Sequence, residues 1–117
     1  MIAYRDLLPA VKAKGDHVVG FLQRLVQVPS RTGNEEQVAA LVARELRTLG
    51  IDSRVDGCGN IIGRIPGAAG RSVMLHAHLD IVDPGDAHRW KYPPFSGELA
   101  DGHVWGRGSV DDKGCVA

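Results

Sequence analysis

The run HAHLD, from His76 to Asp80, places two histidines and a carboxylate at alternate positions after an apolar stretch. In an extended chain alternate side chains share a face, so His78 and Asp80 are expected to project together. A metal-bound histidine usually donates its second ring N–H to such a carboxylate, which fixes the tautomer and raises the basicity of the ring. The pair is therefore a candidate half of a metal site; the alternative is polar residues at the edge of a sheet.

A second group of interest is the glycine-rich run GRGSVDDKG, from Gly106 to Gly114. It matches neither common phosphate-binding pattern, because Asp111 stands where the dinucleotide spacing needs glycine and Gly114 stands where the phosphate loop needs Ser or Thr. Glycines followed by carboxylates can instead present an oxygen ligand to a metal, with Asp111 as the candidate. The alternative is that the two aspartates begin a helix, whose dipole favours acidic residues, and we favour it for Asp112.

The adjacent carboxylates of Glu35 and Glu36 could also suit a hydrolase, which needs a base. They fall in the first turn of an expected helix, where acidic residues are favoured for structural reasons, so we assign them to the helix start.

Two helices are expected in the first half of the chain. The first runs from Asp16 until Pro29 stops it, because proline lacks an N–H donor and disfavours helix in the residue before it. The second follows Thr32 and Glu35, which have capping-box spacing, and ends at Gly50, where a left-handed cap is favoured. Apolar residues recur at helical spacing in both, at Val18, Val19, Leu22, Leu25 and Val26 and then at Val38, Leu41, Val42, Leu46 and Leu49.

Strands are expected in the second half. The segment from Ser72 to Leu79 is apolar on both faces at its start, which is typical of a strand buried in the middle of a sheet. It would carry His78 to its carboxyl end, the edge at which open α/β sheets bind ligands. Two hairpins are also predicted, one from Ile51 to Val55 and Asn60 to Ile65, the other from Gly97 to Ala100 and His103 to Trp105. Together with a long loop from Asp80 to Phe95, these elements indicate an α/β fold in one domain.

Composition excludes several classes of protein. The 117 residues suit one domain, and 14 basic against 14 acidic residues leave no field to attract nucleic acid. The longest stretch without a charged residue, Ser72 to Leu79, is far short of the ~20 apolar residues that a membrane span needs. Charges near the N-terminus argue against a signal peptide, and two cysteines suit a reducing compartment, so a cytoplasmic location is expected.

The two groups, in order with WKYPPFSGEL from Trp90 and DGHVW from Asp101, resemble one family closely. It is the dinuclear zinc metallopeptidase and deacylase family of acetylornithine deacetylase, succinyl-diaminopimelate desuccinylase, aminoacylase, glutamate carboxypeptidase and the cytosolic dipeptidases. The resemblance extends from about Phe21 to Ala117. It implies that residues 1–117 are the N-terminal portion of a zinc-peptidase-like catalytic domain, truncated, with a mixed sheet flanked by helices.

The resemblance also implies roles for individual residues. His78 would bind one metal, Asp111 would bridge two, and Asp80 would orient His78. The peptide bond between Asp111 and Asp112 would be cis. The cofactor would be two Zn²⁺ per site, with Co²⁺ or Mn²⁺ as alternatives, and the reaction would be hydrolysis of an amide in an N-acyl amino acid or small peptide. A homodimer is allowed for the full-length form.

Three further hypotheses remain open at this point. Barrel-type amidohydrolases have a motif that the HAHLD run also matches. If the chain were one of them, His76 and His78 would both be metal ligands. The family resembled also takes its base and further ligands from sequence beyond Ala117, so the chain alone is expected to be inactive. A third hypothesis is a non-catalytic product that binds metal weakly or pairs with a separate C-terminal piece.

Overall fold

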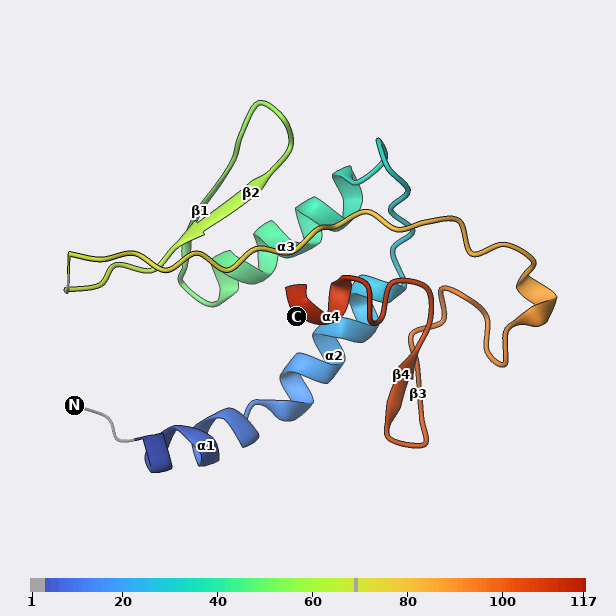
Figure 1. The fold of residues 1–117 in the computed structure, drawn as a ribbon, viewed down its shortest axis with the longest axis horizontal. Helices are drawn as coiled ribbons and strands as arrows, with labels where there is room; N and C mark the ends of the chain where they lie inside the picture. The colour runs from blue at the N-terminus through green and yellow to red at the C-terminus, as the bar shows by residue number, and fades with distance from the viewer. Residues whose placement is uncertain (1–3, 69) are drawn as a thin grey trace.

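A computed structural model describes residues 4–68 and 70–117 (Figure 1). The described residues contain no helix that is long and apolar enough to cross a membrane. Their helices are α1 (Tyr4–Lys12), α2 (Gly15–Val26), α3 (Glu36–Thr48), a 3-10 turn at Ala87–Arg89, and α4 (Lys113–Val116). Their strands are β1 (Asp52–Val55), β2 (Ile61–Arg64), β3 (Glu98–Ala100) and β4 (His103–Trp105).

The two predicted helices are confirmed as α2 and α3. Their apolar stripes meet in a small core, in which Phe21 and Leu25 of α2 and Val38 of α3 are buried. Leu79 packs against this core from the segment that carries the candidate site. Helix α1, which the apolar spacing did not predict, precedes α2 and contains Pro9.

The expected capping box at the start of α3 is wrong. The residue at the N-cap is Glu35, whose side chain makes no capping hydrogen bond and instead accepts from the backbone N–H of Gly33, at 2.8 Å. The hydroxyl of Thr32 donates to the Asp80 carboxylate, at 2.6 Å, because an ionised acceptor forms a stronger hydrogen bond than a neutral one. At the other end of α3, Gly50 has the predicted left-handed conformation, with φ of 71°.

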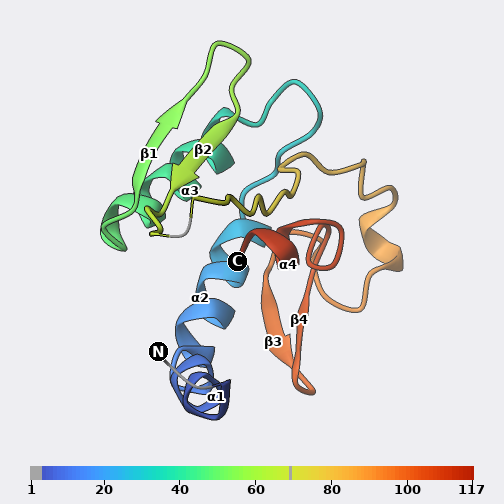
Figure 2. The same cartoon turned by 60° about the vertical axis from the view of Figure 1, so that its left-hand side comes forward.

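Both predicted hairpins are present as antiparallel pairs. In the first, Asp52 lies opposite Arg64, and the hairpin packs on α3; in the second, Glu98 lies opposite Trp105. Strand β4 contacts α2, so the second hairpin lies beside that helix (Figure 2). Among the described residues a single parallel bridge, from Arg31 to Ile81, adds to these pairs. The α/β class is therefore confirmed.

The prediction of a buried central strand from Ser72 to Leu79 is wrong for this chain. The segment runs extended outside both sheets (Figure 1), and Val73, Met74 and Leu75 are 90%, 84% and 93% exposed. A strand becomes regular only when a neighbour pairs with its backbone N–H and C=O groups, and within the described chain no neighbour does so over these residues. The apolar pattern is present, but the partner that would bury it is not among the described segments.

Candidate metal centre

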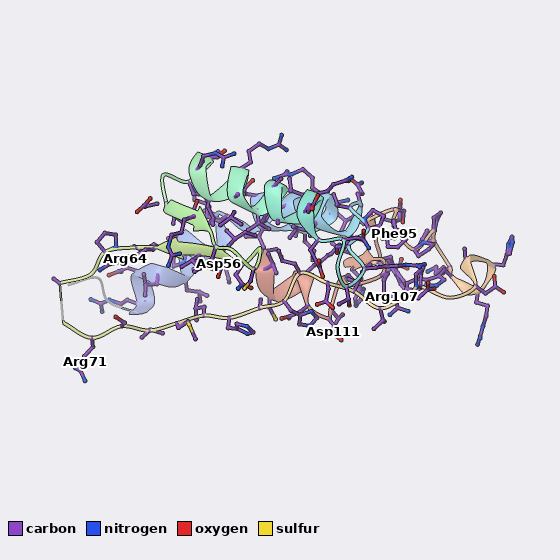
Figure 3. The ribbon with its side chains drawn as sticks, turned by 90° about the horizontal axis from the view of Figure 1, so that it is seen from above. Asp56, Arg64, Arg71, Phe95, Arg107 and Asp111 are labelled. Carbon is purple, nitrogen blue, oxygen red and sulfur yellow. The ribbon has the colours of Figure 1, made fainter. Side chains whose placement is uncertain are left out.

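The candidate site is a hollow of about 230 Å³ between two stretches of chain. One stretch is the end of the extended segment, including His78 and Asp80, and the other is the loop between β4 and α4, from Gly106 to Asp111. Figure 3 shows Asp111 beside the extended segment, at a distance along the molecule from Arg71. The two runs that the sequence singled out thus form one site.

The His78 imidazole lies between two carboxylates. Its Nδ1 is 3.1 Å from Oδ1 of Asp80, and its Nε2 is 2.9 Å from Oδ1 of Asp111. The alternation along an extended chain accounts for the first contact, whereas 33 residues of folded chain separate the partners of the second. The structure therefore brings together all three residues of the predicted site. The roles of His78 and Asp111 as metal ligands, and of Asp80 as the residue that orients His78, stay predictions.

Electrostatics in the site follow from these contacts. The hydrogen bond with Asp111 raises the pKa of His78, and burial opposes the rise only partly. Thr32 is the main cause of the lowered pKa of Asp80, with His78 contributing as well. The Asp80 carboxylate can therefore hold a negative charge facing the imidazole ring, an arrangement that would also attract a cation.

Asp112 precedes α4, as expected, but does not act as a conventional helix cap. Its carboxylate accepts from the backbone N–H of His78, at 3.2 Å, and makes no capping hydrogen bond. A hydrogen bond from the Cys115 thiol is the main cause of the lowered pKa of Asp112. The peptide bond between Asp111 and Asp112 is cis, as the family resemblance implied. The two adjacent aspartates therefore contact different parts of His78: Asp111 contacts the ring and Asp112 the backbone N–H.

Two glycines let the loop approach the rest of the molecule closely. A Cβ on Gly106 would lie 2.3 Å from Cγ1 of Val26, and one on Gly108 would lie 2.6 Å from Cγ2 of Ile81. Gly108 also has a φ of 83°, which residues with side chains rarely adopt. These glycines serve close packing of the loop, which sets the position of Asp111.

Lys113 anchors the same loop and was missed as a structural residue. Its side chain is fully buried, and Nζ donates to the carbonyl oxygens of Leu25, at 2.8 Å, and Val28, at 2.6 Å. Burial lowers the pKa of Lys113 to about 8. A lysine two residues after a candidate ligand carries no sequence signal of burial, since Lys is usually exposed.

His78 and Asp111 offer atom types that bind zinc, but they supply only part of a zinc coordination shell. Imidazole nitrogen and carboxylate oxygen are both zinc ligands, and catalytic zinc sites usually have three protein ligands. Within residues 4–68 and 70–117 no group of three or more His, Cys, Asp or Glu side chains is placed to hold a metal. His76, which the barrel-type alternative requires as a ligand, is exposed and joins no such group.

Comparison with known proteins places this site in a family. The model of peptidase family M20/M25/M40 matches residues 74–117, the stretch that holds His78, Asp80 and Asp111. The chain is 39% identical over 97 residues to succinyl-diaminopimelate desuccinylase of Paracoccus denitrificans (strain Pd 1222), covering 80% of this chain and 25% of that protein. The chain belongs to peptidase family M20/M25/M40.

Other relatives of this M20/M25/M40 chain agree. It is 42% identical over 97 residues to succinyl-diaminopimelate desuccinylase of Cereibacter sphaeroides (strain ATCC 17029 / ATH 2.4.9), covering 80% of this chain and 26% of that protein. It is 31% identical over 117 residues to the uncharacterized protein YgeY of Escherichia coli (strain K12), covering 99% of this chain and 29% of that protein. The chain thus spans a quarter to three tenths of the length of these relatives.

Proposed function

We propose that the polypeptide to which this chain belongs is a zinc-dependent hydrolase of amide bonds in N-acyl amino acids or small peptides. The observation that carries the proposal is the His78 imidazole held between Asp80 and Asp111. In the proposed site His78 binds one metal, Asp111 bridges two, and Asp80 orients His78. Zn²⁺ is the expected cofactor, with Co²⁺ or Mn²⁺ as alternatives.

Each residue has a defined part in this proposal. Asp80 accepts the Nδ1–H of His78, which leaves the Nε2 lone pair free to bind a metal on the side of Asp111. The mostly exposed carboxylate of Asp111 has oxygens available on the open side of the hollow. When bound, zinc would lower the pKa of a coordinated water toward ~7 and polarise the scissile carbonyl.

The substrate class comes from the family and from named relatives. Two relatives are succinyl-diaminopimelate desuccinylases, so an N-succinyl amino acid is a sensible first substrate to test. We further propose that residues 1–117 are the N-terminal portion of the catalytic domain and that the full-length form is a homodimer. Two free, exposed cysteines, Cys58 and Cys115, suit the proposed cytoplasmic location.

The chain by itself is proposed to be inactive. The site offers two candidate metal-ligating atoms that face each other, His78 Nε2 and Asp111 Oδ1. A catalytic zinc usually needs about three protein ligands. The same shortage favours a second candidate function, a non-catalytic chain that binds metal weakly or pairs with a separate C-terminal piece. The exposed apolar run from Val73 to Leu75 is consistent with such pairing.

A chimera tests the proposed function. The 97 matched residues of the Paracoccus denitrificans desuccinylase would be replaced by those of this chain, and zinc-dependent release of succinate measured. We expect an active chimera that loses activity in His78→Ala and in Asp111→Ala. His88→Ala is the matched control, because His88 is exposed and lies outside the hollow.

Three results would each contradict a part of the proposal. An active chimera that tolerates both His78→Ala and Asp111→Ala would remove these residues from the site. Zinc-dependent hydrolysis by the purified 117-residue chain would show that the chain alone is sufficient. If His78→Ala leaves zinc binding by the chain unchanged, in competition with a metallochromic chelator, the metal assignment also fails.

A further inference from the structure

The connection between α2 and α3 reaches the candidate site through Thr32. This residue lies 48 positions before Asp80, and its Oγ1 donates to Oδ2 of Asp80 at 2.6 Å. Thr32 does not cap α3, because the N-cap residue is Glu35. Its hydroxyl donates to Asp80 instead. The hydrogen bond joins the first third of the sequence to the predicted metal-binding residues.

The backbone around this contact is tied at several points. Ser30 is fully buried; its hydroxyl donates to the carbonyl oxygen of Leu79, at 2.7 Å, and its own carbonyl accepts from the N–H of Ile81, at 2.8 Å. Arg31 and Ile81 form the parallel bridge, and Arg31 also pairs with Asp83. Thr32 therefore faces Asp80 from a backbone that is itself held in place.

The two oxygens of the Asp80 carboxylate have different partners. Oδ2 accepts from Thr32, and Oδ1 faces Nδ1 of His78, at 3.1 Å. Because the two oxygens are rigidly linked, holding one restricts where the other points. The ring of His78 then directs Nε2 toward Asp111.

We propose that Thr32 is a positioning residue, which holds the carboxylate of Asp80 so that it accepts the Nδ1–H of His78 and leaves Nε2 free to bind a metal. The metal part of this inference rests on the proposed function, whereas the control of the His78 tautomer by Thr32 does not. Thr32 touches neither His78 nor Asp111 in the contacts described, so it acts through Asp80.

The test reads the tautomer of His78 directly. The 117-residue chain, labelled with ¹⁵N-histidine, would be studied by NMR at a pH above the pKa of the imidazole. Because Oδ1 of Asp111, 2.9 Å from Nε2, would itself favour the Nε2–H tautomer, every sample also carries Asp111→Ala. In this background we expect the Nδ1–H tautomer to predominate with Thr32 and with Thr32→Ser, and to lose its predominance with Thr32→Val. Thr48→Val is the matched control, because Thr48 also uses its hydroxyl, on the carbonyl of Arg44 in α3, away from the site.

The outcomes separate a positioning role from a structural one. Thr32→Ala removes the same hydroxyl, so a folding defect confined to Thr32→Val does not decide the result. If only one of these two variants keeps the wild-type amide spectrum, a wild-type tautomer in that variant would overturn the proposal. If both keep it, a wild-type tautomer in Thr32→Ala would overturn it. A change in Thr48→Val equal to that in Thr32→Val would also overturn it.

Zinc affinity is the second readout. Loss of a residue that orients a metal-binding histidine typically weakens metal binding 10–100-fold, and since Thr32 acts through Asp80 we expect about tenfold weaker binding in Thr32→Val and recovery in Thr32→Ser. A changed tautomer in Thr32→Val supports the positioning role even if the wild-type chain binds no zinc, because the described part of the chain offers only His78 and Asp111 as ligands. The proposed function is tested separately, by the chimera. Unchanged zinc affinity in a folded Thr32→Val, when the wild type binds, contradicts the metal part of the inference.

Discussion

At the scale of single residues, His78 is defined by its two carboxylate neighbours. Spacing predicted the contact with Asp80, because residues two apart in an extended chain share a face. The contact with Asp111 depends on a loop 33 residues later, which local spacing cannot place. The family resemblance supplied that pairing, since it implied a shared metal for the two residues.

The pKa of His78 should lie above its ordinary value of about 6.5 in the metal-free chain, because Asp111 favours the imidazolium. Asp111→Asn should lower it, as measured by NMR titration. Because the folded-state pKa is raised, the stabilisation from this pair is fully present below the ordinary pKa and is lost as the pH rises through the folded value. An unchanged titration midpoint in Asp111→Asn would contradict the observed contact, and Asp101→Asn, on the distant β3–β4 turn, is the matched control.

At the scale of elements, a buried lysine at the start of α4 fixes the loop between β4 and α4 against the end of α2. Lys113 donates to the carbonyl oxygens of Leu25, in the last turn of α2, and of Val28, two residues past the end of the helix. Gly106 and Gly108 allow the loop backbone to approach Val26 and Ile81. The position of Asp111 thus depends on contacts with α2 and with the extended segment.

Lys113→Met should destabilise the chain by about 1–3 kcal/mol, because it leaves the partly buried carbonyl oxygen of Val28 without its donor and removes one of the donors to Leu25. The pKa of Lys113 is lowered to about 8, so between about 8 and 10.4 the unfolded state holds more protons than the folded state. The contribution of Lys113 to stability should therefore rise with pH across this window and be constant below it.

Urea unfolding of wild type and Lys113→Met at several pH values would measure this difference. Lys91→Met is the control, since Lys91 is exposed and pairs with Asp101 on the surface. A difference in the free energy of unfolding between wild type and Lys113→Met that is independent of pH from 8 to 10.4 would contradict the lowered pKa.

At the scale of the whole molecule, the two hairpins and the helices leave the apolar segment from Val73 to Leu75 uncovered. Val73, Met74 and Leu75 have the composition of a buried strand, yet lie almost fully in solvent. An unpaired extended segment exposes both its backbone groups and its side chains to pairing with other chains. We therefore expect the isolated chain to self-associate.

Leu75→Lys should reduce self-association, because a charge on an exposed edge opposes strand pairing between chains. Sedimentation velocity across a range of protein concentrations would measure it. Ile65→Lys adds the same charge at another exposed apolar position, 76% exposed, and should have a smaller effect. Monomeric wild-type chain that unfolds cooperatively would contradict the expectation.

Periodicity and turn chemistry in the sequence predicted α2, α3 and both hairpins, because these elements depend on residues that are neighbours along the chain. The ordered motifs also pointed to the M20/M25/M40 family and to His78, Asp80 and Asp111. The tertiary structure decided which atoms meet. It assigned Thr32 to Asp80 instead of a helix cap, buried Lys113 under the loop and left the run from Val73 to Leu75 unpaired. These outcomes depend on partners dozens of residues away, or on the lack of one among the described segments, and local sequence patterns carry no information about such partners.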